Sequence, residues 1–327
     1  MPTKNKIMEH FIKFENQSAA KKLIKKAVQF KEKPFLEKEI GTNLKIGLIF
    51  LNPSLRTRVS TQIAAKNLGM EAIVFNIDKE GWALEFEEGA IMNENKAEHI
   101  KEAASVLGSY FDILAIRAFP TLTDKKQDIA DKVIHQFIKY SQIPVVSLES
   151  SSRHPLQSLA DMMSIEETWK QHSKPKIVLS WAPHVKALPH AVPNSFAEWA
   201  LGMNHDLTIT QPKGYELDEH FTNGAKIEYD QEKAVADADF VYVKNWSSYH
   251  DYGNLPKVES DWLLKSHHLK ESAKIMHCLP VRRNLELADE LLDGNKSLVP
   301  LQAENRIYAA QAVLFEIISQ IKAGNAN

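Results

Sequence analysis

Two arginines and two hydroxyl side chains lie close together directly after an apolar segment. The apolar segment, residues 44–50, has the length and composition of a buried strand. The polar residues that follow it are Ser54, Arg56, Thr57 and Arg58, and apolar residues then recur at helical spacing. Free N–H groups at the start of a helix favour an anion, and hydroxyl and guanidinium donors suit phosphate oxygens. The stretch therefore predicts a phosphate-binding turn between a strand and a helix; the plainer alternative is a capped helix with two surface arginines.

The composition is that of a globular protein with two domains of ordinary size. The chain has 327 residues, of which 44% are hydrophobic and 25% charged, and its formal net charge is −2. It has neither a strong basic block nor an apolar run long enough to span a bilayer, so we expect no nucleic-acid and no membrane partner. No apolar signal core follows the first residues, and the single cysteine, Cys278, excludes an internal disulfide. These features predict a cytoplasmic protein.

In the first half of the chain, apolar segments typical of strands alternate with segments of helical periodicity. Strands are expected at residues 44–50, 71–77, 112–116 and 144–148, helices at 7–31, 59–68, 97–110 and 124–140, and a loop with some helix at 78–95. The alternation favours a parallel sheet with crossover helices, in which ligands bind at the carboxyl ends of the strands. Ser54, Arg117 and Glu149 all lie at such ends.

The second half repeats this alternation after a long helix that begins at residue 153. Strands are expected at residues 176–181, 206–210, 225–229, 240–244 and 275–278, and helices at 194–201, 217–221, 231–236, 285–292 and 303–321. A proline-rich segment at 182–193 interrupts the pattern as a stiff, irregular loop. We predict an α/β fold with two doubly wound parallel-sheet domains, residues 1–154 and 155–303.

Three short motifs point to one enzyme family. They are Pro-Ser-Leu-Arg-Thr-Arg at residues 53–58, Arg-His-Pro-Leu-Gln at 153–157 and His-Cys-Leu-Pro at 277–280. Each is weak alone, because a histidine beside a proline is usually structural and a buried cysteine is usually a small hydrophobe. Their order and separation together resemble the aspartate and ornithine carbamoyltransferases over nearly the whole chain.

Further segments resemble one subfamily, the N-acylornithine carbamoyltransferases that act on N-acetylornithine or N-succinylornithine in variant arginine biosynthesis. These segments are residues 81–82, 183–184, 192–196, 244–246 and 280–284. The Ser-Met-Gly loop of ordinary ornithine enzymes is absent. An aspartate enzyme would carry a serine and a lysine in the loop that here carries Trp82, so we rank that alternative low.

The resemblance implies two binding sites. Carbamoyl phosphate would be bound by Ser54, Leu55, Arg56, Thr57, Trp82, Arg117, His154, Pro155, Leu156, Gln157, Cys278, Leu279 and Arg306. Trp82 would reach it from a neighbouring subunit, and Gln157 would hold the carbamoyl amide. The acylornithine would be bound by Glu149, His184, Lys244, Arg282 and Ala97. On the residues alone, Lys244 could equally be a surface lysine, Trp82 a packing residue, Arg306 a solvated residue and His184 a structural one.

The implied chemistry uses Arg56, Thr57, Arg117, His154 and Cys278 as catalytic residues. Cations and N–H donors would stabilise the charge that builds on the leaving phosphate. The attacking δ-amine must be neutral, although its ordinary pKa resembles that of lysine, ~10.4. No covalent intermediate is required, so Cys278 is interpreted as a positioning group, and no cofactor or metal is expected.

Other classes of function predict motifs that the sequence lacks. A nicotinamide dehydrogenase would show Gly-x-Gly-x-x-Gly after a strand, and a P-loop enzyme Gly-x-x-x-x-Gly-Lys-Ser/Thr; neither is present. A non-catalytic binding module remains the plain alternative.

The resemblance also implies a homotrimer with shared active sites, a deep backbone knot formed by residues 182–193 and a last helix, 304–327, that packs on the first domain. Ala97 would line the acyl pocket, where acetylornithine enzymes tend to carry glutamate and succinylornithine enzymes proline. A glutamate would fill space and repel a succinyl carboxylate, whereas Ala97 does neither. We therefore predict N-succinyl-L-ornithine as the substrate, with N-acetyl-L-ornithine as the alternative.

Overall fold

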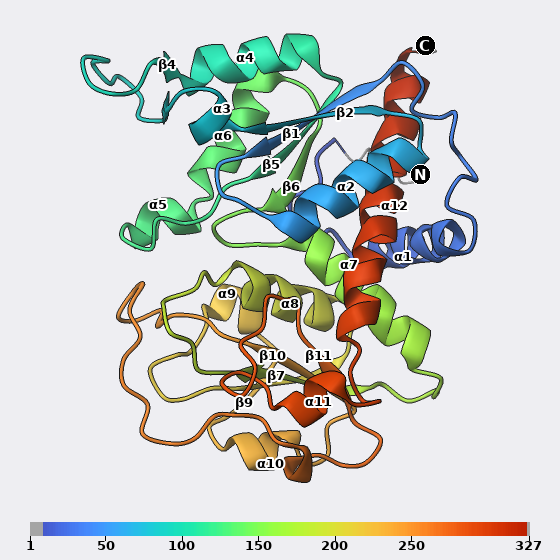
Figure 1. Ribbon diagram of the computed structural model, residues 1–327, viewed down its shortest axis with the longest axis vertical. Coiled ribbons are helices and arrows are strands. Elements are labelled where there is room, and N and C mark those ends of the chain that lie inside the picture. Colours follow the sequence, from blue (N-terminus) through green and yellow to red (C-terminus); the bar gives the residue numbers. More distant parts are fainter. Residues whose placement is uncertain (1–8, 326–327) are drawn as a thin grey trace, which may run out of the picture.

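The computed structural model describes residues 9–325 and contains two parallel sheets, one in each α/β domain (Figure 1). The first sheet has the order β2-β1-β5-β6, with β1 at Lys45–Phe50, β2 at Glu71–Asn76, β5 at Ile113–Arg117 and β6 at Val145–Glu149. Strands β1, β2 and β5 are connected by helices. The chain adds β2 on one side of β1 and then adds β5 on the other side, so the strand order reverses between β1 and β5. The carboxyl ends of these two strands therefore form a switch point, where parallel sheets bind ligands.

The second sheet has the order β11-β10-β7-β8-β9 and is also entirely parallel. Its strands are β7 (Lys176–Trp181), β8 (Asp206–Thr210), β9 (Lys226–Glu228), β10 (Phe240–Lys244) and β11 (Lys274–Met276). The chain adds β8 and β9 on one side of β7 and then β10 and β11 on the other side. The strand order therefore reverses between β7 and β10, which gives this domain a switch point of its own. A small separate pair, β3 (Leu84–Glu85) and β4 (Glu98–His99), lies outside both sheets.

Helices cover the sheets on both faces. Those of the first domain are α1 (Gln17–Glu32), α2 (Leu55–Asn67), α3 (Ile77–Glu80), α4 (Ile100–Tyr110), α5 (Lys125–Ile129) and α6 (Lys132–Ser141). Those that follow are α7 (Pro155–Thr168), α8 (Ala191–Gly202), α9 (Glu219–Thr222), α10 (Gln231–Val235), the 3₁₀ turn at Ser266–His268, α11 (Asp289–Asp293) and α12 (Val299–Asn325). None of the described helices is long and apolar enough to cross a membrane.

Successive side chains of β1 point to opposite faces of the sheet, and both faces are buried, which explains the continuous apolar run in its sequence. Leu48 packs in the cluster that contains residues of α1, α7 and α12, whereas the next residue, Ile49, packs in the cluster that contains residues of α4 and α6. Both side chains are 0% exposed. Since a strand covered on both faces needs apolar residues at every position, the run at β1 is continuous and not alternating.

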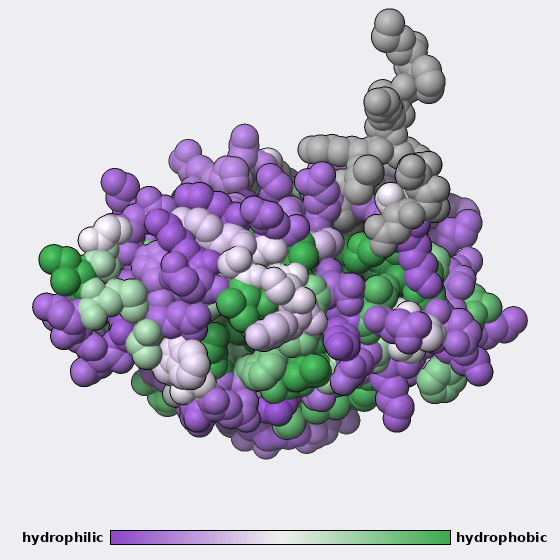
Figure 2. All heavy atoms as spheres, turned by 90° about the horizontal axis from the view of Figure 1, so that it is seen from above, coloured by the Kyte–Doolittle hydropathy of each residue, from purple (hydrophilic) through white to green (hydrophobic). Residues whose placement is uncertain are grey.

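Helix α7 lies between the two sheets, and α12 begins at the same level and runs along the side of the first domain (Figure 1). Helix α12 packs against α7, α2 and α1, and so joins the end of the chain to the first domain. Helix α7 is buried along residues 155–165, because it has neighbours on every side. Seen from the end of the first domain, the surface is mostly hydrophilic, with hydrophobic side chains gathered in small groups (Figure 2).

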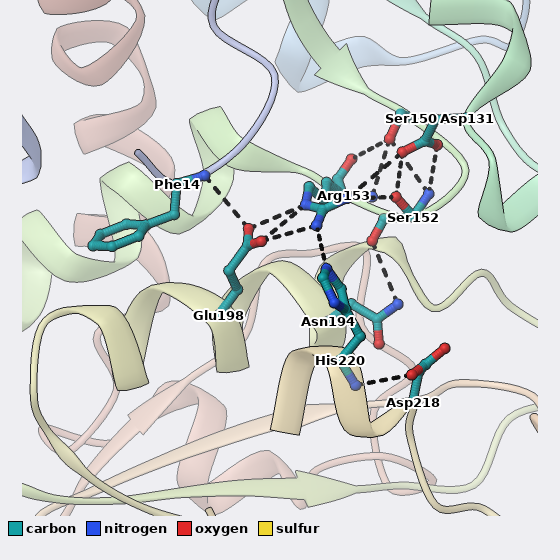
Figure 3. A network of polar contacts seen from close by, with 9 residues as sticks. All are labelled: Phe14, Asp131, Ser150, Ser152, Arg153, Asn194, Glu198, Asp218 and His220. Atoms are coloured by element: carbon teal, nitrogen blue, oxygen red, sulfur yellow. Dashed lines mark hydrogen bonds and ion pairs between the residues drawn. The ribbon is translucent and has the colours of Figure 1, made fainter. Parts of the chain in front are cut away.

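Arg153, two residues before the start of α7, makes contacts that join the two domains (Figure 3). Its Nε donates to Glu198 of α8 at 3.0 Å, and Glu198 also accepts the backbone N–H of Phe14 at 3.4 Å. On the other side, Arg153 Nη1 donates to Ser152 Oγ at 3.2 Å, and Ser152 in turn binds the Asp131 carboxylate. This network fixes the segment that leads into the His-Pro-x-Gln motif.

The sequence predictions of α1 and of the helix at 124–140 were wrong in part. Residues 7 and 8 lie outside the described part of the chain, and α1 begins only at Gln17, because Phe11 pairs with Val146 at the edge of the first sheet. The helix at 124–140 is broken at Asp131, which has a positive φ of 47° and whose carboxylate accepts the backbone N–H of Ser152 at 3.0 Å. A tertiary contact therefore determines each difference.

Two further helix boundaries differ from the prediction. The helix expected from residue 97 begins at Ile100, because the preceding residues pair as β4 with β3. The helix expected at 285–292 is reduced to α11, because the backbone N–H of Asn284 is bound by Leu287 O at 2.7 Å in a turn. The last three residues of the proline-rich segment, 191–193, form the first turn of α8.

Candidate active site

The carboxyl ends of both sheets face a single large cavity of about 780 Å³. The motifs at 53–57, 154–157 and 277–280 all supply residues to its wall. The sequence-predicted residues that line it are Ser54, Leu55, Arg56, Thr57, Arg117, Glu149, His154, Gln157, His184, Lys244, Cys278, Leu279, Arg282 and Arg306. Segments distant in the sequence are therefore brought to one site by the two switch points.

The Ser54–Thr57 turn has the geometry of an anion site. Ser54 is the N-cap of α2, and its Oγ accepts the backbone N–H of Thr57 at 3.3 Å. Leu55 is the first residue of α2 and is 74% exposed, so it leaves the N-terminus of this 13-residue helix open. Unpaired N–H groups and the positive end of the helix dipole are thus presented to the cavity.

Three arginines surround Thr57. Its Oγ1 accepts hydrogen bonds from Arg117 Nη1 at 3.4 Å and from Arg306 Nη2. The Nε atoms of Arg56 and Arg117 are buried and have no hydrogen-bond partner among the described residues. Burial lowers the pKa of Arg306 to about 10, and the neighbouring arginines contribute to this shift. Such a concentration of cations is costly without an anion, which is what a phosphate would supply.

His154 and Glu149 lie next to these arginines. Glu149 Oε2 is 2.7 Å from Arg117 Nη1 and 3.6 Å from His154 Nε2. Burial, together with Arg306 and Arg117, holds the pKa of His154 well below its usual value, so its imidazole is neutral. Burial raises the pKa of Glu149, and Arg117 opposes this effect. His154 Nδ1 is buried and has no hydrogen-bond partner among the described residues.

The other wall of the cavity carries residues of the second domain. Lys244 ends β10, and Arg282 Nε donates to His184 Nε2 at 3.1 Å. Burial lowers the pKa of His184 and raises the pKa of the Cys278 thiol. A neutral thiol is a poor nucleophile, which fits a positioning role for Cys278. Lys244 and Arg282 make this wall suitable for a carboxylate.

Four of the predicted site residues do not line the cavity of this chain. Pro155 and Leu156 are buried in the first turn of α7, where they place Gln157. Trp82 is 56% exposed and its Nε1 donates to Glu98 at 2.8 Å. Ala97 is exposed in the same segment and its backbone N–H donates to Ala83 O at 3.2 Å. Within a single chain, Trp82 and Ala97 are therefore not brought together with the other site residues.

Sequence reasoning missed several residues of the site. Phe119 lies against Arg117, with its ring centre 4.3 Å from the guanidinium carbon. Asp161 and Gln302 form a buried hydrogen-bonded layer behind Gln157. Asp161 could have been found, because it lies four residues after Gln157 on the same helix. The pairing of α7 with α12 that brings in Gln302 has no comparable local signal.

Comparisons with known proteins agree with this geometry. Residues 9–167 match the carbamoyl-P binding domain of the aspartate/ornithine carbamoyltransferases, and residues 190–317 match their Asp/Orn binding domain. The chain therefore belongs to the aspartate/ornithine carbamoyltransferase family.

Individual relatives are similar over nearly their full length. The chain is 42% identical to N-succinylornithine carbamoyltransferase of Bacteroides thetaiotaomicron, with 96% of this chain and 100% of that protein covered. It is 34% identical to N-acetylornithine carbamoyltransferase of Xanthomonas axonopodis pv. citri, with coverages of 97% and 99%. A solved structure of a mutant N-acetyl-L-ornithine transcarbamylase, complexed with carbamyl phosphate and N-succinyl-L-norvaline, superposes with a TM-score of 0.89. It is 32% identical, and the match covers 94% of this chain and 98% of that one.

Proposed function

We propose that this protein transfers the carbamoyl group of carbamoyl phosphate to the δ-amine of N-succinyl-L-ornithine, giving N-succinyl-L-citrulline and phosphate for arginine biosynthesis. The observation that carries the proposal is the cavity of about 780 Å³ at the carboxyl ends of both sheets. One wall presents Arg56, Arg117 and Arg306, and the other presents Lys244 and Arg282. The first set suits a phosphate dianion and the second an anionic acyl amino acid. The 42% identity to an N-succinylornithine carbamoyltransferase supports the same reaction.

The phosphate would bind at the start of α2, where the backbone N–H groups and the hydroxyls of Ser54 and Thr57 are available. Arg56, Arg117 and Arg306 would neutralise its charge. As the bond between the carbonyl carbon and the phosphate oxygen breaks, negative charge moves onto phosphate, and fixed cations stabilise this change without reorganising. The phosphate wall therefore contributes to catalysis as well as to binding.

The carbonyl group would lie beside Thr57, Arg117 and His154. These donors would stabilise the oxyanion that forms when the neutral δ-amine attacks the carbonyl carbon, and Gln157 would hold the carbamoyl amide. The tetrahedral intermediate collapses with loss of phosphate, which accepts the proton released by the amine. The enzyme forms no covalent bond, so Cys278 would only position the reactants, and no cofactor is required.

The choice of succinyl over acetyl rests on the space at Ala97 and on the cations of the acylornithine wall. A succinyl group ends in a carboxylate, for which His184, Lys244 and Arg282 would supply hydrogen bonds and positive charge. Ala97 neither fills this space nor repels a carboxylate. N-acetyl-L-ornithine is the second candidate, since the 34% identity to an acetylornithine enzyme also spans the chain. It would leave a cation-lined space empty.

A homotrimer would complete the site. The segment between α3 and α4 projects from the first domain in Figure 1 and exposes Trp82, Ile91 and Met92. We propose that a neighbouring subunit inserts this segment, so that its Trp82 reaches carbamoyl phosphate and its Ala97 lines the acyl pocket. Light scattering that gives the mass of a monomer for a fully active sample would remove this proposal.

We further propose that residues 1–154, together with residues 304–327, bind carbamoyl phosphate, that residues 155–303 bind the acylornithine, and that the enzyme works in the cytoplasm. A deep knot formed by residues 182–193 belongs to the same proposal. It rests on the family resemblance; the segment also contacts the chain beyond β10, where Ser247 N–H donates to Leu188 O at 3.1 Å. A crystal structure in which the segment passes freely over the surface would contradict the knot.

Calorimetry followed by a product assay tests the function. Titration with carbamoyl phosphate should show binding, and adding an acylornithine should then release phosphate and form a citrulline-type ureido product. Binding without product would favour a non-catalytic binding module.

A further inference from the structure

Asp161 lies in the middle of α7, behind the wall of the cavity, and is 0% exposed. Its oxygen Oδ1 accepts two hydrogen bonds at 2.8 Å, one from Gln157 Nε2 on the same helix and one from Gln302 Nε2 on α12. One carboxylate oxygen thus joins two glutamine side chains on facing helices.

These two hydrogen bonds determine where each glutamine oxygen points. A primary amide donates from its nitrogen and accepts at its oxygen, so donation to Asp161 turns the oxygen the other way. Gln157 Oε1 accepts Arg306 Nη1 at 2.9 Å. Gln302 Oε1 accepts the backbone N–H of His277 at 2.9 Å. Without a common acceptor, either amide could turn and present its N–H₂ group to another donor.

The two arms lead to different halves of the cavity. Through Gln157, the first arm reaches Arg306, which also binds Thr57 at the start of α2. Through Gln302, the second arm reaches His277, whose Nδ1 accepts the backbone N–H of Leu279 at 2.9 Å. The chain of hydrogen bonds therefore runs from the phosphate wall to the His-Cys-Leu-Pro segment of the second domain.

We propose that Asp161 is a positioning residue, whose acceptor oxygen fixes both glutamine amides and so aligns the carbamoyl phosphate half of the site with the His277–Leu279 half. The proposal deepens the proposed function and rests on it for its kinetic readout. The role belongs to the oxygen and not to the charge, because a carboxylate, a carboxylic acid and an amide all present an acceptor at this place.

The surroundings of Asp161 explain why charge is not essential. Burial raises its pKa to about 7, and Gln157 and Gln302 oppose this effect. The other ionisable groups that face it are Arg306 from α12, Tyr242 from β10 and Cys278 after β11. Both protonation states are therefore within reach near neutral pH, and both keep the acceptor.

Two substitutions separate the acceptor from the charge. Asp161→Leu keeps a similar volume but removes the acceptor, and Asp161→Asn keeps an acceptor oxygen and removes the charge. With carbamoyl phosphate as the varied substrate, the leucine variant should lose about tenfold to a hundredfold in kcat/KM, as expected when buried amides lose their acceptor. The asparagine variant should restore kcat/KM to within about threefold of wild type.

Asn305→Ala is the matched control. Asn305 lies three residues after Gln302 on α12 and donates to Ser164 Oγ on α7 at 3.0 Å, across the same helix pair. It makes no hydrogen bond to Gln157 or His277 among the described residues. Removal of the Asn305 amide should lower the melting temperature of the protein and leave kcat/KM unchanged. A loss of kcat/KM equal to that of Asp161→Leu would mean that the junction matters only structurally, and would overturn the proposal.

Wild-type kinetics in Asp161→Leu would also overturn it, as would an asparagine variant as impaired as the leucine variant. If Asp161→Leu does not fold, Gln302→Met cuts only the second arm. It should lower kcat/KM for the acylornithine by about tenfold and leave the Kd of carbamoyl phosphate unchanged; an unchanged kcat/KM would contradict the proposal. If wild type shows no transfer, the proposed function fails by itself. Calorimetric titration with carbamoyl phosphate then decides, since only Asp161→Leu should weaken its Kd about tenfold or more.

Discussion

The guanidinium of Arg117 and the carboxylate of Glu149 form a buried ion pair inside the candidate phosphate site, with 2.7 Å between Nη1 and Oε2. They lie at the carboxyl ends of the adjacent strands β5 and β6, where they are partners after a shift of register between Ile116 and Arg117. An acidic residue among three arginines offsets part of the positive charge that an incoming dianion would otherwise meet. We therefore expect Glu149 to moderate anion binding while it holds Arg117 in place.

Replacing this carboxylate should strengthen anion binding. In Glu149→Gln, the amide oxygen can still accept from Arg117, but the negative charge beside the phosphate site is gone. We expect inorganic phosphate to bind about threefold to tenfold more tightly, as measured by calorimetry, while KM for the acylornithine rises. Weaker phosphate binding would show that Glu149 mainly orients Arg117.

Removal of an arginine of the phosphate wall should weaken carbamoyl phosphate binding. Arg56→Ala and Arg117→Ala each delete a charge-assisted contact worth roughly 1.5–3 kcal/mol, which corresponds to about 10- to 150-fold in Kd. Arg58→Ala is the matched control, because Arg58 lies on the same turn of α2 but does not line the cavity. Wild-type affinity in either test variant, or an equal loss in the control, would refute the assignment.

The strands and the strand-end residues could be predicted from the sequence because they depend on local pattern. Strand β1 is buried on both faces, so its run of apolar residues marks it, and Arg117 and Glu149 follow from the ends of β5 and β6. The beginning of α1 could not be predicted, because it depends on the pairing of Phe11 with Val146. The two residues of such a contact lie far apart in the sequence, and their pairing leaves no periodic signal.

The site shows the same division. The hydroxyl cap of Ser54 on α2 is local and could be predicted from the sequence. The contact of Gln302 with Asp161 depends on how α12 packs on α7 and could not. Trp82 and Ala97 were named only through a family resemblance, and a single chain leaves both outside the cavity. Their proposed roles need a second subunit, which no pattern within one chain describes.

Cys278→Ser should retain measurable turnover. Burial raises the pKa of the thiol, so the residue is protonated at neutral pH, which fits the positioning role proposed for it. We expect kcat within about tenfold of wild type, since a hydroxyl replaces the thiol with little change in shape. The measurement is steady-state release of phosphate. Complete loss of turnover with carbamoyl phosphate binding intact would revive covalent catalysis.

His190 should make the protein less stable in acid. Burial lowers its pKa to about 4, and its Nε2 lies 2.8 Å from Ser247 O. Because the unfolded chain has the higher pKa, ~6.5, it binds the proton first, and stability is lost as pH falls from 6.5 towards 4. Between pH 7 and 5 this group should remove about 2 kcal/mol of unfolding free energy.

His190→Gln provides the test, since an amide N–H can still donate to Ser247 O but does not titrate. Urea unfolding of both proteins at pH 7 and pH 5 should show a decline smaller by about 2 kcal/mol in the variant. Equal declines would mean that His190 is not the group responsible.

The most direct test of the proposed function is a comparison of kcat/KM for N-succinyl-L-ornithine, N-acetyl-L-ornithine and free L-ornithine at saturating carbamoyl phosphate, in wild type and in Ala97→Glu. We predict that wild type prefers the succinyl substrate. We also predict that Ala97→Glu, which places a second carboxylate beside the succinyl group, shifts the preference towards the acetyl substrate by at least about tenfold. A wild type that prefers N-acetyl-L-ornithine, or an Ala97→Glu variant with unchanged selectivity, would contradict it.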